Sequence, residues 1–265
     1  MTDFTPGLCS VTFRRLEPAA IVAIARAAGL RAIEWAGDVH VRPGDLATAR
    51  SVRAVTENAG LTVASYGSYV APPEDGPDGF GAVIDTAAAL GTSNIRIWPG
   101  TRGRASTTYA EADRRRATAG IAALADMAEQ RGVTVALEHH PDSLTDTTES
   151  AERLVGNVAS SALYLYWQPR PGLPLDEALA EIGRLGRHVS HLHVFAWDRS
   201  KTRYPLASQA DYWRRIIAAL PATRWPGRRY AMLEFVAGDA PERLAEDAAT
   251  LADVLASVRA GGLGR

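Results

Sequence analysis

The chain has 265 residues, of which 46% are hydrophobic and 22% are charged, and its formal net charge at pH 7 is −1. This length is close to the roughly 250 residues of one (β/α)8 barrel, so we expect a single domain over residues 1–265. The near-zero charge argues against nucleic acid or an anionic membrane as a partner. One cysteine, Cys9, excludes an intrachain disulfide. Because we also find no secretory leader and no apolar run of membrane length, we expect a cytoplasmic protein.

Short apolar runs alternate with helical patterns from one end of the chain to the other. The runs predict strands at 7–13, 31–36, 61–66, 94–98, 133–138, 163–167, 189–195 and 230–235. Helical patterns follow them at 18–28, 45–59, 77–90, 106–131, 147–157, 174–186, 208–220 and 240–259. Eight strand-then-helix units predict parallel strands with right-handed crossovers, closed into one (β/α)8 TIM barrel.

Local signals mark several boundaries between these elements. Pro18 suits the first turn of its helix, and Thr145 or Thr147 can cap the helix that follows the fifth strand. The glycine-rich tail at 260–265 is expected to fray. The chain has neither a G-x-G-x-x-G turn after its first strand nor a P-loop, which removes support for a nucleotide-binding fold.

Polar side chains stand at the C-terminal ends of four consecutive predicted strands, where barrel enzymes place their active sites. These residues are Glu138, Gln168, His193 and Glu234. Each alone could be a polar cap on its strand, but two carboxylates brought together repel each other unless a cation joins them. Oxygen ligands with one imidazole suit Mn²⁺ first, with Mg²⁺, Co²⁺ or Zn²⁺ as alternatives.

At these residues the chain resembles the sugar phosphate isomerase/epimerase family, which has the xylose isomerase-like barrel. The segments that carry the resemblance are Leu137-Glu138-His139-His140, His191-Leu192-His193, Leu233-Glu234-Phe235 and Ile33-Glu34-Trp35. The family pattern has an aspartate at the end of the sixth strand, whereas this chain has Gln168 followed by Pro169. Glutamine can bind a metal through its carbonyl oxygen but brings no charge. We therefore expect the metal to bind more weakly and to be more electrophilic.

The resemblance implies proton transfer next to a substrate carbonyl. Glu138 and Glu234 would act as base and acid on opposite faces of a sugar or keto-polyol, through an enediolate that the metal stabilises. A small sugar-like molecule is therefore the expected partner, and relatives of this kind suggest a homodimer or homotetramer.

Further residues are candidates for contact with the substrate. They are Glu34, His40, Arg96, Trp98, His140, Lys201 and Arg203. Each has an ordinary structural alternative. Glu34 and Arg96 can pair with each other, and His140 can orient Glu138 instead of binding the substrate. His40, Lys201 and Arg203 can be solvated loop residues, and Trp98 can be a packing residue.

Three other functions remain open. A lyase, such as a dehydratase or a deglycosidase, would use the same proton abstraction with a leaving group on the next carbon. A DNA repair endonuclease of the same fold would need more zinc ligands and a basic face, which six histidines and a charge of −1 disfavour. A non-catalytic carbohydrate-binding barrel would explain Gln168 as the mark of a degraded metal site.

Overall fold

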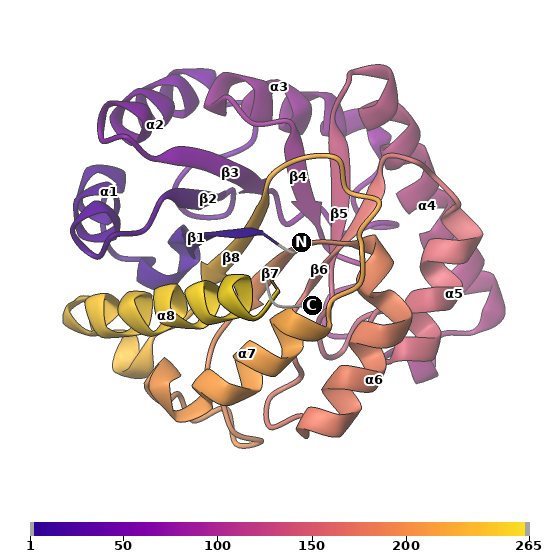
Figure 1. Cartoon of the computed structure of the whole chain (residues 1–265). Helices are drawn as coiled ribbons and strands as arrows, with labels where there is room; N and C mark the ends of the chain where they lie inside the picture. The colour runs from indigo at the N-terminus through magenta and orange to yellow at the C-terminus, as the bar shows by residue number, and fades with distance from the viewer. Residues whose placement is uncertain (1–2, 263–265) are drawn as a thin grey trace.

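The computed structural model describes residues 3–262, and in this part of the chain eight parallel strands close a barrel in the order β1 to β8. The strands are β1 (Phe4–Cys9), β2 (Ala32–Ala36), β3 (Thr62–Gly67), β4 (Asn94–Ile97), β5 (Thr134–Glu138), β6 (Leu163–Trp167), β7 (Val189–Val194) and β8 (Arg229–Leu233). The helices between them are α1 (Pro18–Ala27), α2 (Leu46–Asn58), α3 (Phe80–Leu90), α4 (Glu111–Gln130), α5 (Thr148–Val158), α6 (Leu175–Leu185), α7 (Ala210–Ala219) and α8 (Leu244–Gly262). Figure 1 shows these helices as a ring around the strands. The predicted (β/α)8 TIM barrel is confirmed.

Two hydrophobic clusters follow from the alternation of side chains along the strands. The inner cluster fills the barrel with alanines, tyrosines and other residues, including Ala136, Tyr166 and Met232. The outer cluster joins the opposite faces of the strands to the helices, as Val135 and Leu137 do on β5. Because both faces of each strand are covered, a polar side chain inside the barrel needs a polar partner or a ligand.

The first strand differs from its predicted range. It was expected at 7–13, but β1 begins at Phe4 and ends at Cys9, and residues 10–13 form a 3-10 turn. Phe4 and Pro6 pair with Arg229 and Ala231 of β8, so pairing with this neighbour extends the strand on the N-terminal side of its predicted start at Gly7. The turn then aims Ser10 back at β2, whose Ala36 N–H donates to the Ser10 hydroxyl. Cys9 therefore closes its strand at the mouth of the barrel.

The C-terminal end of the last helix also differs from the prediction, whereas the cap of the fifth helix is one of the two predicted threonines. Helix α8 continues to Gly262, so residues 260–262 of the expected frayed tail are helical, whereas residues 263–265 lie outside the described part. The apolar face of α8 packs on the barrel through Leu251 and Leu255, which favours helix beyond the point where the glycines alone would end it. At α5, Thr147 is the cap and accepts from Ser150 N–H at 3.2 Å.

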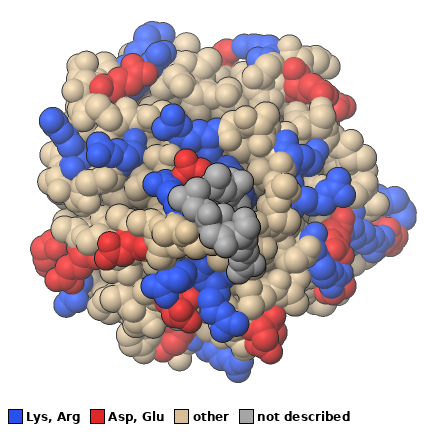
Figure 2. Space-filling view, viewed as in Figure 1, with Lys and Arg blue, Asp and Glu red and all other residues tan. Residues whose placement is uncertain are grey.

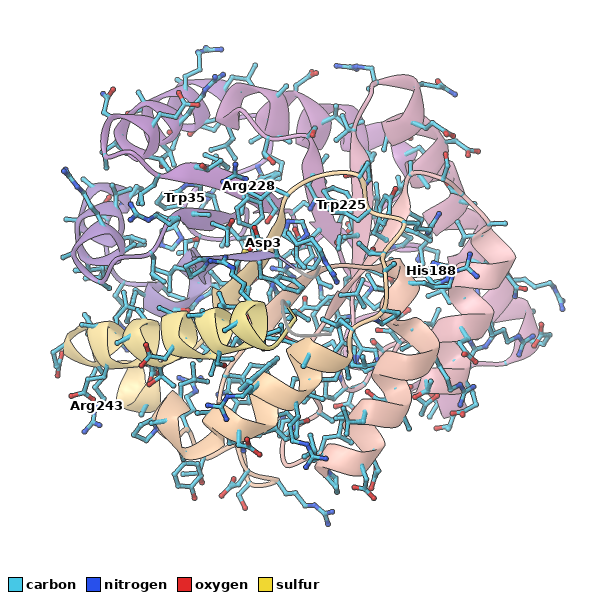
Figure 3. All side chains as sticks on the ribbon, in the orientation of Figure 1. Asp3, Trp35, His188, Trp225, Arg228 and Arg243 are labelled. Atoms are coloured by element: carbon cyan, nitrogen blue, oxygen red, sulfur yellow. The ribbon has the colours of Figure 1, made fainter. Side chains whose placement is uncertain are left out.

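The view in the figures is onto the pole of the barrel where the strands begin. Asp3, Trp225 and Arg228, which precede β1 and β8, lie over the centre of Figure 3. Figure 2 shows basic and acidic side chains interspersed on this face. No helix in the described residues is both long and apolar enough to cross a membrane.

Candidate metal centre and active site

The four predicted metal ligands come together at the C-terminal ends of β5 to β8. The Nδ1 atom of His193 lies 3.1 Å from Gln168 Oε1, 3.4 Å from Glu234 Oε2 and 3.7 Å from Glu138 Oε1. All four residues are buried. The loop after β5 fixes one of them, because the Thr145 hydroxyl donates to the Glu138 backbone carbonyl at 2.6 Å.

These donors fit a divalent cation in spacing. Ligands bound about 2.1 Å from one metal are separated from each other by roughly 3.0–3.5 Å. The separations of His193 Nδ1 from Gln168 and Glu234 lie in this range, and the 3.7 Å separation from Glu138 lies just above it. Glu138, His193 and Glu234 also form a buried set whose ligand atoms all lie within 4.8 Å of one another.

A buried arginine, Arg96 of β4, is part of the same cluster. Its Nε donates to Glu34 Oε1 at 3.0 Å, and its Nη1 donates to Glu138 Oε2. The hydroxyl of Ser65 donates to the other Glu34 oxygen at 2.7 Å. Gly67 makes room for the pair, because a Cβ at that position would lie 2.7 Å from Arg96 Nη2. The predicted ion pair of Glu34 with Arg96 is therefore present, and the same arginine also restrains Glu138.

The charges of this cluster leave room for a cation. Glu34, Glu138 and Glu234 bring three negative charges and Arg96 one positive charge, a balance of −2 that a divalent ion neutralises when His193 is uncharged. Burial disfavours charge on His193, but Cys9 and Glu234 outweigh it and hold its pKa well above the ordinary value. Without an ion, a proton on His193 therefore supplies part of the missing positive charge. The residues present fit a divalent metal in both charge and spacing.

Burial and charge pairing also set the state of the carboxyl groups. Burial raises the pKa of Glu34, but Arg96 and His193 overcome this effect and hold it below its usual range. Burial likewise raises the pKa of Glu234, and His193 and Arg96 again lower it. Both groups are therefore carboxylates at neutral pH.

A cavity of about 70 Å³ opens onto the ligand set. It is lined by Glu138, His140, Pro141, Gln168, Pro169, Pro171, Phe195, Trp197, Lys201, Glu234 and Phe235. This volume is well below the roughly 300–1,000 Å³ of pockets that bind small molecules. A sugar-sized ligand needs the surrounding loops to move apart. Lys201 and Phe235 have positive φ angles of 61° and 55°, a conformation that costs energy for non-glycine residues and clusters at functional sites.

His140 lines the cavity, whereas its neighbour His139 does not. The His140 ring packs against Trp98 with centroids 4.5 Å apart, and its Nδ1 lies 2.6 Å from the Pro141 carbonyl. A carbonyl only accepts, so Nδ1 carries the hydrogen and Nε2 of the neutral ring is free to accept a proton. His139 points outward toward helix α6, where its Nε2 lies 3.9 Å from Glu181.

Two predicted substrate contacts lie elsewhere. The Nδ1 atom of His40 hydrogen-bonds with the Ser10 hydroxyl at 2.9 Å, and its ring packs edge-on against Trp35. These contacts are structural. Arg203 pairs with Asp239 and packs over Phe235 at 4.5 Å, so it links the loops after β7 and β8 behind the cavity wall.

The sequence interpretation missed three residues of this site: Cys9, Ser65 and Gly67. Cys9 is the register partner of Glu34 in the β1–β2 pair, and Glu34 is the partner of Ser65 in the β2–β3 pair. A correct end for β1 would have put Cys9 at the barrel mouth. Ser65 and Gly67 carry no comparable signal in the sequence.

Comparisons with known proteins agree with this fold. A family model described as xylose isomerase-like TIM barrel matches residues 22–254. The structure is similar to that of the probable 3-DHS dehydratase AsbF from Bacillus anthracis, with 20% identity, coverage of 94% of this chain and 99% of that one, and a TM-score of 0.74. A xylose isomerase-like TIM barrel protein from Mycobacterium smegmatis in complex with magnesium has 16% identity, coverage of 96% and 97%, and a TM-score of 0.71. D-psicose 3-epimerase from Clostridium cellulolyticum H10 has 15% identity, coverage of 95% and 98%, and a TM-score of 0.63. No curated protein matches the chain significantly.

Proposed function

The chain belongs to the xylose isomerase-like TIM barrel family, and we propose that it is a divalent-metal-dependent enzyme that moves a proton next to the carbonyl of a small sugar-like substrate. The observation that carries this proposal is the set of three oxygen donors that lie 3.1–3.7 Å from His193 Nδ1, itself the fourth donor, beside a cavity. Glu138, Gln168, His193 and Glu234 would hold the ion, with Mn²⁺ the first expectation. Such an ion polarises a carbonyl and stabilises the negative charge that develops beside it.

Isomerisation or epimerisation is the first candidate reaction, and its two proton carriers would be the two glutamates. Glu234 is the better base of the two. Its Oε2 faces His193, and no described group hydrogen-bonds to its Oε1, whereas Arg96 and Gln168 between them contact both oxygens of Glu138. Glu234 would remove the proton, and Glu138 would return one on the other face of the substrate.

The same asymmetry supports a lyase as the second candidate. Elimination needs one base and one acid for the leaving group, so it does not require Glu138 to release Arg96. His140, with Nε2 free and its ring held by Trp98, would be the partner of Glu234 in that reaction. A psicose epimerase and a dehydratase of similar structure both occur among the neighbours.

The substrate contacts in this proposal are Lys201, His140 and Trp98. Lys201 is the one lysine in the sequence and lines the cavity, so we expect it to meet an anionic or strongly polar end of the substrate. Arg96 would act through Glu138 and Glu34, because its donors already serve both carboxylates.

Product analysis with Mn²⁺-loaded protein tests both candidates. Ketoses, ketose phosphates and cyclic polyhydroxy ketones would be supplied, and products would be examined by mass spectrometry and NMR. An isomerase conserves substrate mass, and a dehydratase releases water. We expect Glu234→Gln to lower kcat by a factor of about 10³ or more, since a general base contributes roughly 10²–10⁴-fold and the variant also loses charge at the metal.

The matched control is Glu242→Gln, the same chemical change at an exposed residue before α8. It should leave the rate unchanged. A Glu138→Gln/Glu234→Gln double variant with full activity on the identified substrate would contradict the proposed mechanism.

A further inference from the structure

The second ring nitrogen of His193, Nε2, lies near Glu34, whereas Nδ1 lies near the other three predicted metal ligands. This Nε2 is buried and has no hydrogen-bond partner among the described residues. It lies 3.6 Å from Glu34 Oε1. The Cys9 thiol, also fully buried, completes a set in which sulfur, carboxylate oxygen and ring nitrogen all lie within 4.8 Å of one another. An unpartnered buried nitrogen beside a thiol and a carboxylate has the chemistry of an empty coordination site.

We propose that Cys9, Glu34 and His193 Nε2 form a second, deeper metal site that selects a thiophilic ion such as Zn²⁺ or Co²⁺. Sulfur and imidazole ligands favour these ions, whereas Mn²⁺ and Mg²⁺ favour the oxygen-rich set around Nδ1. Three protein ligands leave one coordination position open, as is usual for zinc sites that are not purely structural. We name the three residues the deep site and the four predicted ligands around Nδ1 the outer site.

Glu34 can serve this deep site without releasing Arg96. A carboxylate oxygen accepts more than one bond, so Glu34 Oε1 can hold Arg96 Nε at 3.0 Å and still bind an ion. Ser65 occupies the other oxygen and fixes the carboxylate in place. The strand register also favours the site, since Cys9 and Glu34 are direct partners across β1 and β2.

Charge and proton balance are also satisfied. A cysteine binds a metal as its thiolate and an imidazole binds through a lone pair, so both ligands must give up a proton to the solvent. Binding of one divalent ion forms bonds to sulfur, oxygen and nitrogen and releases two protons to solvent, one from the thiol and one from the imidazolium. The two charges of the ion replace the charges of the two released protons, so the net charge of the buried cluster does not change.

The deep and outer sites share one imidazole, so they exclude each other. Neutral imidazole carries a hydrogen on one nitrogen and offers a lone pair on the other. An ion at Nε2 therefore leaves Nδ1 protonated, and Nδ1 can donate to Gln168 Oε1 at 3.1 Å instead of binding a metal. Zn²⁺ in the deep site is thus expected to displace Mn²⁺ from the outer site.

Cobalt titration of the metal-free wild-type protein tests this directly. Co²⁺ bound to a thiolate shows an intense charge-transfer band in the near ultraviolet, whereas Co²⁺ bound only by oxygen and nitrogen does not. We expect one equivalent of Co²⁺ to produce the band. Zn²⁺ should abolish it, and Mn²⁺ at the same concentration should leave it in place. Cobalt that binds without the band would overturn the proposal, with no variant needed.

Two variants separate the sites. Cys9→Ser should weaken Zn²⁺ binding at least 10-fold in calorimetry and change the Mn²⁺ dissociation constant by less than 3-fold, and Cys9→Ala provides the same comparison if serine destabilises the fold. Glu234→Gln should do the reverse: it should weaken Mn²⁺ binding and retain the cobalt band. Unchanged Zn²⁺ affinity in both Cys9 variants would refute the deep site, whereas a cobalt band without any Mn²⁺ binding would refute the outer site alone.

Discussion

Arg96 is the side chain whose replacement separates fold stability from metal affinity most clearly. Its guanidinium contacts two carboxylates of the buried cluster, Glu34 and Glu138. Arg96→Met keeps a long apolar stem in place and removes the charge. The change leaves three carboxylates facing one histidine.

The two effects have opposite signs. Removing one partner of a buried ion pair costs about 3–5 kcal/mol, so the metal-free variant should be less stable by that amount. For a protein of this length this corresponds to a fall in Tm of roughly 10 °C. A positive charge about 6 Å away repels each unit of ionic charge by roughly 3 kcal/mol at an effective dielectric constant of about 20. Loss of Arg96 should therefore tighten Mn²⁺ binding by about 100-fold or more, since each tenfold is about 1.4 kcal/mol.

Calorimetric titration of Mn²⁺ and thermal unfolding with and without Mn²⁺ measure both effects. Arg96→Met should unfold earlier without metal and gain more stability from saturating Mn²⁺ than the wild type does. Arg96→Lys is the control, because it keeps the charge and should keep wild-type Mn²⁺ affinity within about 10-fold. Weaker Mn²⁺ binding in Arg96→Met would show that the arginine organises the site and does not compete with the ion, which would refute this reasoning.

Three further predictions concern other residues. Gln168→Asp adds a charge to the ligand set, so calorimetry should show Mn²⁺ affinity raised about 10–100-fold. Gly67→Ala should lower the free energy of unfolding in urea by about 2–3 kcal/mol, because its Cβ meets the buried ion pair, whereas Gly81→Ala, with nothing within 4 Å, should not. Burial and the nearby Arg224 lower the pKa of His188 to about 4. As the pH falls, His188 therefore takes up its proton in the unfolded chain before it does so in the folded chain. The contribution of neutral His188 to the free energy of unfolding is complete above about pH 6.5 and is lost between about pH 6.5 and pH 4. His188→Gln should flatten this part of the curve of stability against pH.

Most of the fold could be read from the sequence because seven strands are short, buried apolar runs bounded by helices. The first strand could not, since its limits depend on pairing with β8. Phe4 and Pro6 form a strand only because Arg229 and Ala231 lie beside them. Local propensity contains no information about a partner more than 220 residues away.

The outer site followed from one rule, that polar residues at strand ends share the barrel mouth. The rule placed Glu138, Gln168, His193 and Glu234 on adjacent strands, and in the structure the other three lie around one nitrogen of His193. It could not show that Arg96 bonds to Glu138, because side-chain reach across β4 and β5 is set by packing and by the space that Gly67 leaves. Nor could it separate the two nitrogens of His193, whose surroundings differ only in three dimensions.

Counting of bound Mn²⁺ by electron paramagnetic resonance tests the central claim most directly. Free hexaaqua Mn²⁺ gives a sharp signal that disappears on binding, so the bound ion is measured by difference. We predict one Mn²⁺ per chain at high micromolar concentration, with binding weakened at least 10-fold in both Glu138→Gln and Glu234→Gln and unchanged in Glu242→Gln. Wild-type protein that binds no Mn²⁺ in this range, or binds it equally well after both glutamates are replaced, would contradict the metal centre proposed for Glu138, Gln168, His193 and Glu234.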